Sequence, residues 1–204
     1  MQVIYIGLAV LMAAGLVLFG VGTGTSGGGL FGGLVGSSSS GNGSSAVSSA
    51  AKTAQQQVNK NPNDPAAWQK LITARWEDAQ GAGFTNSGFN AFGKQQLAQV
   101  TNDYEHYVKL APKPDATTAT YAARAYSYLG DYAQEAHTWD TITSAQPSTV
   151  GYKCLALSAY ASKNTSLGQL AASKMLAHVP KKQRAELQAE LQQAGTKPSL
   201  AVGC

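Results

Sequence analysis

The chain has 204 residues, of which 44% are apolar and 13% are charged, about half the charged share of an ordinary globular protein. Its net charge of +4 is dispersed along the sequence, which argues against a nucleic-acid-binding surface. No Asp, Glu, Lys or Arg precedes Lys52, so the sequence divides into an uncharged N-terminal quarter and an ordinary soluble remainder.

Residues 1–25 are predicted to form a single-pass transmembrane anchor that holds the protein in a cell membrane. Residues 3–21 are apolar or glycine apart from Tyr5, and a helix of that length nearly matches a hydrocarbon core about 30 Å thick. The alternative is a cleaved signal peptide, but the segment lacks a basic n-region and an A-x-A cleavage site. Too few basic residues flank the span to indicate on which side of the membrane the rest of the chain lies.

Residues 26–45 are rich in Gly and Ser and are predicted to be a flexible linker. Just before it, Gly20 and Gly24 have the spacing of small residues in transmembrane helix dimers. This spacing keeps open a second class of protein, a structural membrane protein that self-associates through its anchor into a homo-oligomer.

Residues 46–195 are predicted to be all-α, because apolar residues recur at helical spacing and no long alternating strand pattern occurs. Residues 120–147 illustrate this: small and aromatic residues recur on both sides of Gly130, which ends the first helix in a left-handed conformation. Residues 196–204 are predicted to be a disordered tail. Eight helices are expected, near residues 46–60, 65–80, 91–110, 115–129, 131–145, 149–162, 165–178 and 180–194.

Prolines at 62, 112, 147 and 180 end successive helix pairs, and their last two intervals, of 35 and 33 residues, bracket the 34-residue tetratricopeptide period. Other repeat positions are matched by Trp68, Leu71, Ile72, Tyr104, Ala123, Tyr126, Gly130, Tyr132, Ala136, Ala156, Tyr160 and Ala171. Over residues 46–194 the chain resembles the tetratricopeptide repeat (TPR) family, in its membrane-anchored bacterial type. An insertion at residues 81–93 departs from the family pattern.

The resemblance implies a right-handed α-solenoid of about three helix pairs with flanking helices. Within it, the side chains of Trp68, Tyr104, Tyr126 and Tyr132 are expected to be buried between helices. The implied function is that of a non-catalytic scaffold or adaptor, whose concave groove binds a protein or peptide partner.

In such a fold the first helix of each pair lines the groove. The expected partner-binding residues are therefore Gln69, Lys70, Thr73, Trp76 and Glu77, then Thr120, Tyr121, Arg124 and Tyr128, and finally Leu155 and Ser158. Trp76, Tyr121, Tyr128 and Arg124 are of the residue types that most often dominate binding energy. The alternative is that Trp76 and Tyr121 pack under the insertion, which would then cover the groove.

No motif for catalysis, a cofactor or a metal ion is present, so we expect a protein that is not an enzyme. His106, His137 and His178 lie on separate predicted helices without a second ligand at metal-binding spacing. A cleft that gathered His137, Asp140 and tyrosines would favour a helical enzyme instead. Cys154 and Cys204 form no motif: Cys154 is expected to be a small buried residue, and Cys204 a free thiol that is also open to pairing with another chain.

Overall fold

The computed structural model describes residues 47–204. The predicted anchor and linker lie outside this range. Within residues 47–204, no helix combines the length and the apolar character needed to cross a membrane.

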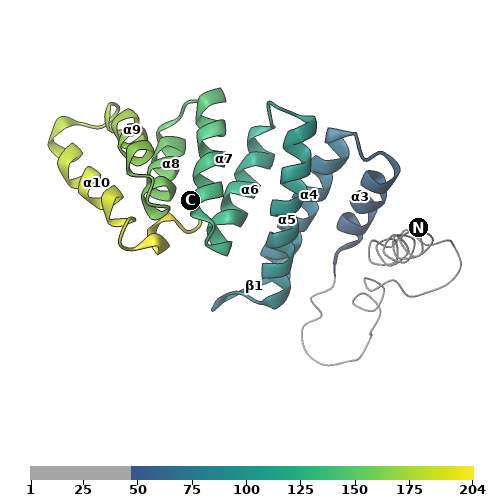
Figure 1. Ribbon diagram of the computed structural model, residues 1–204. Helices are drawn as coiled ribbons and strands as arrows, with labels where there is room; N and C mark the ends of the chain where they lie inside the picture. The colour runs from purple at the N-terminus through teal and green to yellow at the C-terminus, as the bar shows by residue number, and fades with distance from the viewer. Residues whose placement is uncertain (1–46) are drawn as a thin grey trace, which may run out of the picture. The chain divides into compact units, whose positions relative to one another are not determined.

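Eight α-helices follow one another between Ser49 and Gln193 in the described part of the chain (Figure 1). They lie close to the expected bounds and confirm the all-α prediction for this region. The helices are α3 (Ser49–Lys60), α4 (Pro65–Gly81), α5 (Ala91–Leu110), α6 (Ala116–Leu129), α7 (Tyr132–Ala145), α8 (Thr149–Ala161), α9 (Thr165–Leu176) and α10 (Lys181–Gln193).

Local chemistry accounts for where the helices begin and end. All but the last begin after a Ser, Asp or Asn whose side chain accepts a hydrogen bond from a backbone N–H of the first turn, namely Ser48, Asp64, Asn90, Asp115, Asp131, Ser148 and Asn164. Gly130 ends α6 with a φ of 80°, as predicted. The prolines that were expected to end helix pairs all lie between helices, namely Pro62, Pro112, Pro147 and Pro180.

Each helix packs against its neighbours in the sequence, and α4 also contacts α6. Alanines allow this close packing: Ala119, Ala122, Ala123 and Ala125 of α6 are all at most 1% exposed. The aromatic side chains of Tyr104, Tyr107, Tyr126, Trp139 and Tyr160 fill the remaining space. Helix α3 is held on α4 by a smaller apolar cluster of Ala54, Val58, Ala67 and Leu71.

The expected burial of four aromatic residues is confirmed for two of them. Tyr104 and Tyr126 are each 5% exposed. Trp68 and Tyr132 are only partly buried, at the edge of the core. Trp68 lies near the end of the row of helices, where its indole N–H donates a 2.7 Å hydrogen bond to the carbonyl of Pro62 in the preceding loop.

The insertion at residues 81–93 folds into a short β-hairpin between α4 and α5. Its strands β1 (Phe84–Thr85) and β2 (Gly88–Phe89) are antiparallel, with Phe84 opposite Phe89. Two-residue strands are too short to produce an alternating sequence pattern, which explains why no strand was expected.

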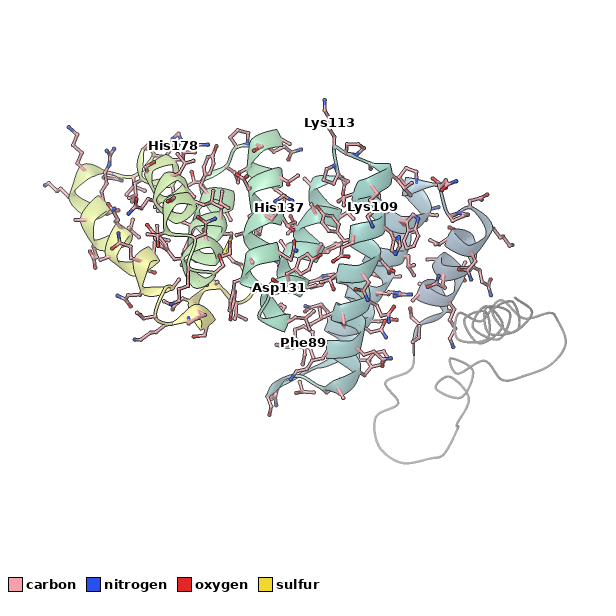
Figure 2. All side chains as sticks on the ribbon, viewed as in Figure 1. Phe89, Lys109, Lys113, Asp131, His137 and His178 are labelled. Atoms are coloured by element: carbon pink, nitrogen blue, oxygen red, sulfur yellow. A yellow bond between two sulfur atoms is a disulfide. The ribbon has the colours of Figure 1, made fainter. Side chains whose placement is uncertain are left out.

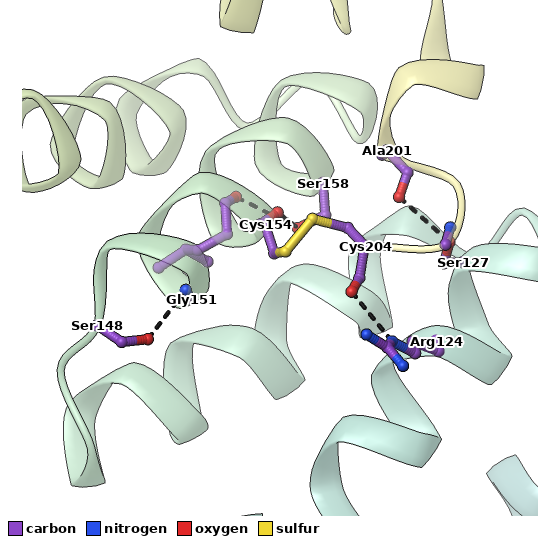
Figure 3. Close-up of a disulfide and its surroundings, with 10 residues drawn as sticks. Arg124, Ser127, Ser148, Gly151, Cys154, Ser158, Ala201 and Cys204 are labelled. Carbon is purple, nitrogen blue, oxygen red and sulfur yellow. Dashed lines mark hydrogen bonds between the residues drawn. A yellow bond between two sulfur atoms is a disulfide. The ribbon is translucent and has the colours of Figure 1, made fainter.

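The tail is ordered, and the prediction of disorder is wrong. Residues 198–201 form the 3₁₀-helix η1 (Pro198–Ala201), which packs against α8. A disulfide joins Cys204 to Cys154 of α8, so neither cysteine is free, contrary to expectation (Figure 3). The two cysteines are 50 residues apart in sequence, and only the approach of the tail to α8 brings them together.

Candidate groove and the covered face beside it

An open groove of about 750 Å³ lies between α3, α4 and the start of α6. Four of the expected partner-binding residues line it, all from α4: Gln69, Lys70, Thr73 and Glu77. The facing wall is formed by Ser49, Thr53 and Gln57 of α3, with Asp115 and Thr117 at the start of α6. The groove therefore combines one cation, two carboxylates and several neutral hydrogen-bonding side chains.

Hydrogen bonds to one buried tyrosine tie together the helices beneath this groove. The hydroxyl of Tyr107 accepts a 2.8 Å bond from the amide of Gln69 and a 2.9 Å bond from the backbone N–H of Asp115. The Asp115 carboxylate in turn caps α6 by accepting from the backbone N–H of Thr118 at 2.9 Å. These contacts join α4, α5 and α6.

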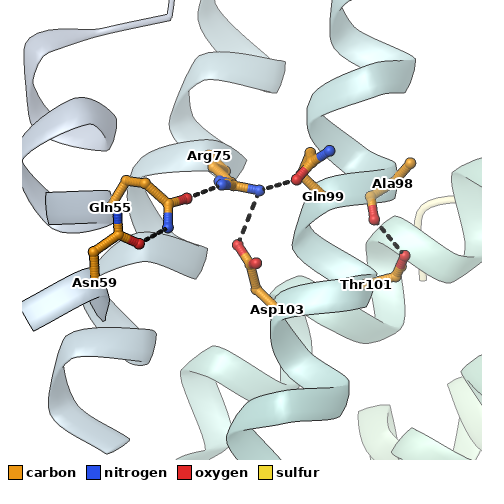
Figure 4. A network of polar contacts seen from close by, with 7 residues as sticks. All are labelled: Gln55, Asn59, Arg75, Ala98, Gln99, Thr101 and Asp103. Atoms are coloured by element: carbon orange, nitrogen blue, oxygen red, sulfur yellow. Dashed lines mark hydrogen bonds and ion pairs between the residues drawn. The ribbon is translucent and has the colours of Figure 1, made fainter. Parts of the chain in front are cut away.

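The wall formed by α3 is held through Arg75 of α4 (Figure 4). The Arg75 guanidinium donates to the side-chain oxygens of Gln55 in α3 and Gln99 in α5, and it pairs with Asp103 at 3.2 Å. Burial lowers the pKa of Arg75, although Asp103 and Asp78 act in the opposite direction. Burial also raises the pKa of Asp103 to about 6 despite the attraction of Arg75. Desolvation thus outweighs the ion pair at both groups.

The aromatic residues expected in the groove contact one another instead. Trp76 is 7% exposed and stacks on Tyr121, and Tyr128 lies tilted against the same indole. Phe89 of the hairpin meets Tyr128 edge to face, with ring centroids 4.7 Å apart (Phe89 is labelled in Figure 2). The insertion therefore reaches this aromatic set through Tyr128, and the alternative expectation, that Trp76 and Tyr121 themselves pack beneath the insertion, stays a prediction.

Three of the four remaining expected residues lie under the tail or inside the core. The Arg124 Nε donates to the backbone carbonyl of Cys204 at 3.2 Å. Leu155 and Ser158 are buried, and the Ser158 hydroxyl donates to the carbonyl of Cys154 in its own helix. Thr120 likewise donates to Ala116 within α6. The expected continuous groove is therefore an open half on α4 and a covered half on α6 and α8.

Sequence reasoning missed the residues of the groove that come from α3 and from the α6 N-terminus. Thr53 and Gln57 are four residues apart and so lie on one helix face, but a polar pair of that kind is common on any exposed helix. The family pattern assigns the groove to first helices only, which excluded α3.

A second cleft, of about 490 Å³, lies between α5 and α7 and bears on the enzyme alternative. It brings His137 together with Tyr104, Tyr126 and Glu105, but Asp140 is not among its lining residues. Burial raises the pKa values of both tyrosines, for Tyr126 with Glu105 and Asp131 adding to the effect, so neither hydroxyl is a base near neutral pH. His178 lies apart from His137 (Figure 2). Residues 47–204 hold no group of three or more His, Cys, Asp or Glu side chains placed to bind a metal ion.

No protein-family model and no curated protein matches this sequence.

Proposed function

We propose that residues 47–204 form a TPR-like, right-handed α-solenoid that acts as a non-catalytic scaffold or adaptor. It binds a protein or peptide partner in the groove between α3, α4 and α6. Residues 1–25 anchor it as a single-pass protein of the cell membrane. The observation that carries the proposal is the open groove of about 750 Å³, which gathers Gln69, Lys70, Thr73 and Glu77.

The packing of each helix on the next supports a repeat architecture, in which every unit contacts only its neighbours. The groove side chains suit a peptide. Gln69, Thr53 and Gln57 offer donors and acceptors to peptide amides, Lys70 offers a charge to a carboxylate, and Glu77 and Asp115 offer charges to a cation. Apolar side chains of the partner would contact Ala54, Ala66 and Ala74 in the same groove.

The disulfide between Cys154 and Cys204 supports an extracytoplasmic location for the adaptor. Disulfides persist in oxidising compartments and are rare where thiols are kept reduced. We therefore place residues 47–204 on the extracytoplasmic side of the membrane.

Photo-crosslinking from within the groove tests the binding site. A photoreactive amino acid at Thr73 points into the groove, and a matched one at Gln188 lies on the exposed surface of α10. We expect a discrete adduct from Thr73 only, and its loss when Lys70→Glu is added. Identical adducts from both positions, or an adduct indifferent to Lys70→Glu, would show that the groove is not the binding site.

A further inference from the structure

The face of α6 and α8 beside the groove is occupied by the chain's own residues 201–204 (Figure 3). Ser127 of α6 donates to the carbonyl of Ala201 at 3.3 Å and accepts from the backbone N–H of Gly203 at 2.8 Å. Arg124 donates to the carbonyl of Cys204 at 3.2 Å. All three bonds engage main-chain atoms of the tail, which here form a turn closed by a 3.2 Å bond from the Cys204 N–H to the Ala201 carbonyl, so these α6 residues recognise the main chain of a turn.

The same face selects small residues. Ala201 is completely buried, whereas its neighbours Leu200 and Val202 are 42% and 41% exposed. Gly203 has a φ of 79°, and a Cβ added there would lie 3.0 Å from the Tyr128 hydroxyl. A side chain at this position is therefore both strained and crowded. The face fits a segment with the pattern small residue, any residue, Gly, Cys.

The cysteine of that pattern is held covalently. Cys154 is 2% exposed beneath the tail, and it forms the disulfide with the half-buried Cys204. The four residues 201–204 are thus recognised through their main chain, selected by size and held covalently. Residues 194–200, which include most of η1, connect them to α10. A short segment with these properties is suited to exchange between identical chains.

We propose that this face is a docking site for residues 201–204 of a second copy of the chain, and that thiol–disulfide exchange swaps the tails to give a covalently linked dimer. An external thiolate attacks the Cys204 sulfur, the Cys154 sulfur leaves as a thiolate, and the tail carries a mixed disulfide. The Cys154 thiolate of another copy then attacks the Cys204 sulfur of that mixed disulfide. A new disulfide forms between the copies, and the external thiol is released unchanged.

Two complementary variants of residues 1–204 test the proposal, because together they permit only one protein disulfide between Cys154 and Cys204. The donor carries Cys154→Ser and the acceptor carries Cys204→Ser, with different affinity tags. After mixing in a glutathione redox buffer, we expect a heterodimer on a non-reducing gel that disappears with dithiothreitol. Helix content measured by circular dichroism checks that both variants are folded.

Substitutions in the donor tail separate recognition from random thiol collision. Gly203→Val in the donor should lower the rate of heterodimer formation at least tenfold, whereas Val202→Ala should leave it within twofold. Equal rates for the two donors, or no heterodimer between folded chains, would overturn the proposal.

A peptide probe gives an independent reading that needs no folded donor. A synthetic peptide of residues 197–204, with its cysteine activated as a mixed disulfide with thionitrobenzoate, should label Cys154 of the acceptor and release the coloured thiol. A peptide with Val in place of Gly203 should react at least tenfold more slowly. Equal labelling by the two peptides would contradict recognition by this face.

Discussion

Trp76 of α4 and Tyr121 of α6 stack with their ring centroids 5.4 Å apart and their planes inclined by 15°. Tyr128, about two turns further along α6, also contacts Trp76, and Phe89 of the hairpin packs against Tyr128. The hairpin is therefore connected to the core through one continuous set of aromatic rings. Side chains that would serve as anchors for a partner in an open groove here stabilise the fold.

Truncating the hairpin's inner phenylalanine should destabilise the protein. Phe89→Ala removes the edge-to-face contact with Tyr128, and we expect the free energy of unfolding to fall by about 2 kcal/mol. Phe84 is the matched control, because it belongs to the same hairpin but is 50% exposed. Phe84→Ala removes only its edge-to-face contact with Phe89 and should cost about 1 kcal/mol or less in the same urea titration. Equal losses would mean that the hairpin does not pack on α6 through Phe89.

Removing one partner of the Arg75–Asp103 pair should be more harmful than removing both. Arg75→Met leaves the Asp103 carboxylate 9% exposed without its cation, and we expect a loss of about 3–5 kcal/mol at pH 7. Adding Asp103→Leu removes the buried charge and should restore most of that loss. The comparison is a double-mutant cycle read by chemical denaturation. If the double variant lost as much stability as the two single variants together, the cost of burying the charges would not outweigh their attraction.

Glu135 should make the protein less stable as the pH rises. It is completely buried, and neither carboxylate oxygen has a hydrogen-bond partner among residues 47–204. Burial raises its pKa from 4.5 to about 8; the indole N–H of Trp139 opposes the rise, but it lies outside hydrogen-bond geometry. Between these two values the folded protein holds a proton that the unfolded chain has released, so stability falls as the pH rises.

The free energy of unfolding should be measured between pH 6 and 8. Below this interval Asp103, whose pKa is raised to about 6, adds a pH dependence of the same sign. Over that interval the free energy of unfolding of the wild type should fall by on the order of 2 kcal/mol. Glu135→Gln should remove this slope, whereas Glu186→Gln, on the exposed surface of α10, should keep it. A slope that persists in Glu135→Gln would assign the pH dependence to other groups.

Opening the disulfide should destabilise the folded unit substantially. It closes a loop of 50 residues, for which the chain-entropy model gives about 4 kcal/mol. Dithiothreitol and the Cys204→Ser substitution should therefore lower the urea midpoint by similar amounts and should not add to each other. A reduced protein as stable as the oxidised one would show that the disulfide constrains nothing in the unfolded chain.

The membrane anchor stays a prediction, because residues 1–25 lie outside the described part of the chain. We expect the protein of residues 1–204 to sediment with membranes and to resist carbonate extraction, because residues 3–21 are apolar enough to span a bilayer. If residues 47–204 lie on the extracytoplasmic side, protease added to cells whose cytoplasmic membrane is intact should cleave them. Any outer layer of the cell envelope must first be made permeable to the protease. Recovery of a soluble form processed near Gly24 would identify the segment as a signal peptide.

The helices were predictable because the information that bounds them is local. A capping side chain such as Asp64 or Asn164 lies within three residues of the backbone N–H that it accepts from, and Gly130 ends α6 through its own backbone angle. Helical spacing of alanines and aromatics likewise appears within a single turn or two. Each of these signals can be recognised without any knowledge of the distant chain.

Tertiary structure alone decided which faces were open and which were covered. Cys154 and Cys204 are separated by 50 residues, and no local pattern distinguishes a tail that packs on α8 from one that does not. The same holds for Phe89 on Tyr128 and for Gln57 and Lys70, which line the same groove from different helices. The physical reason is that a contact between distant residues depends on where every intervening helix places them, whereas a helix boundary depends on one turn of backbone.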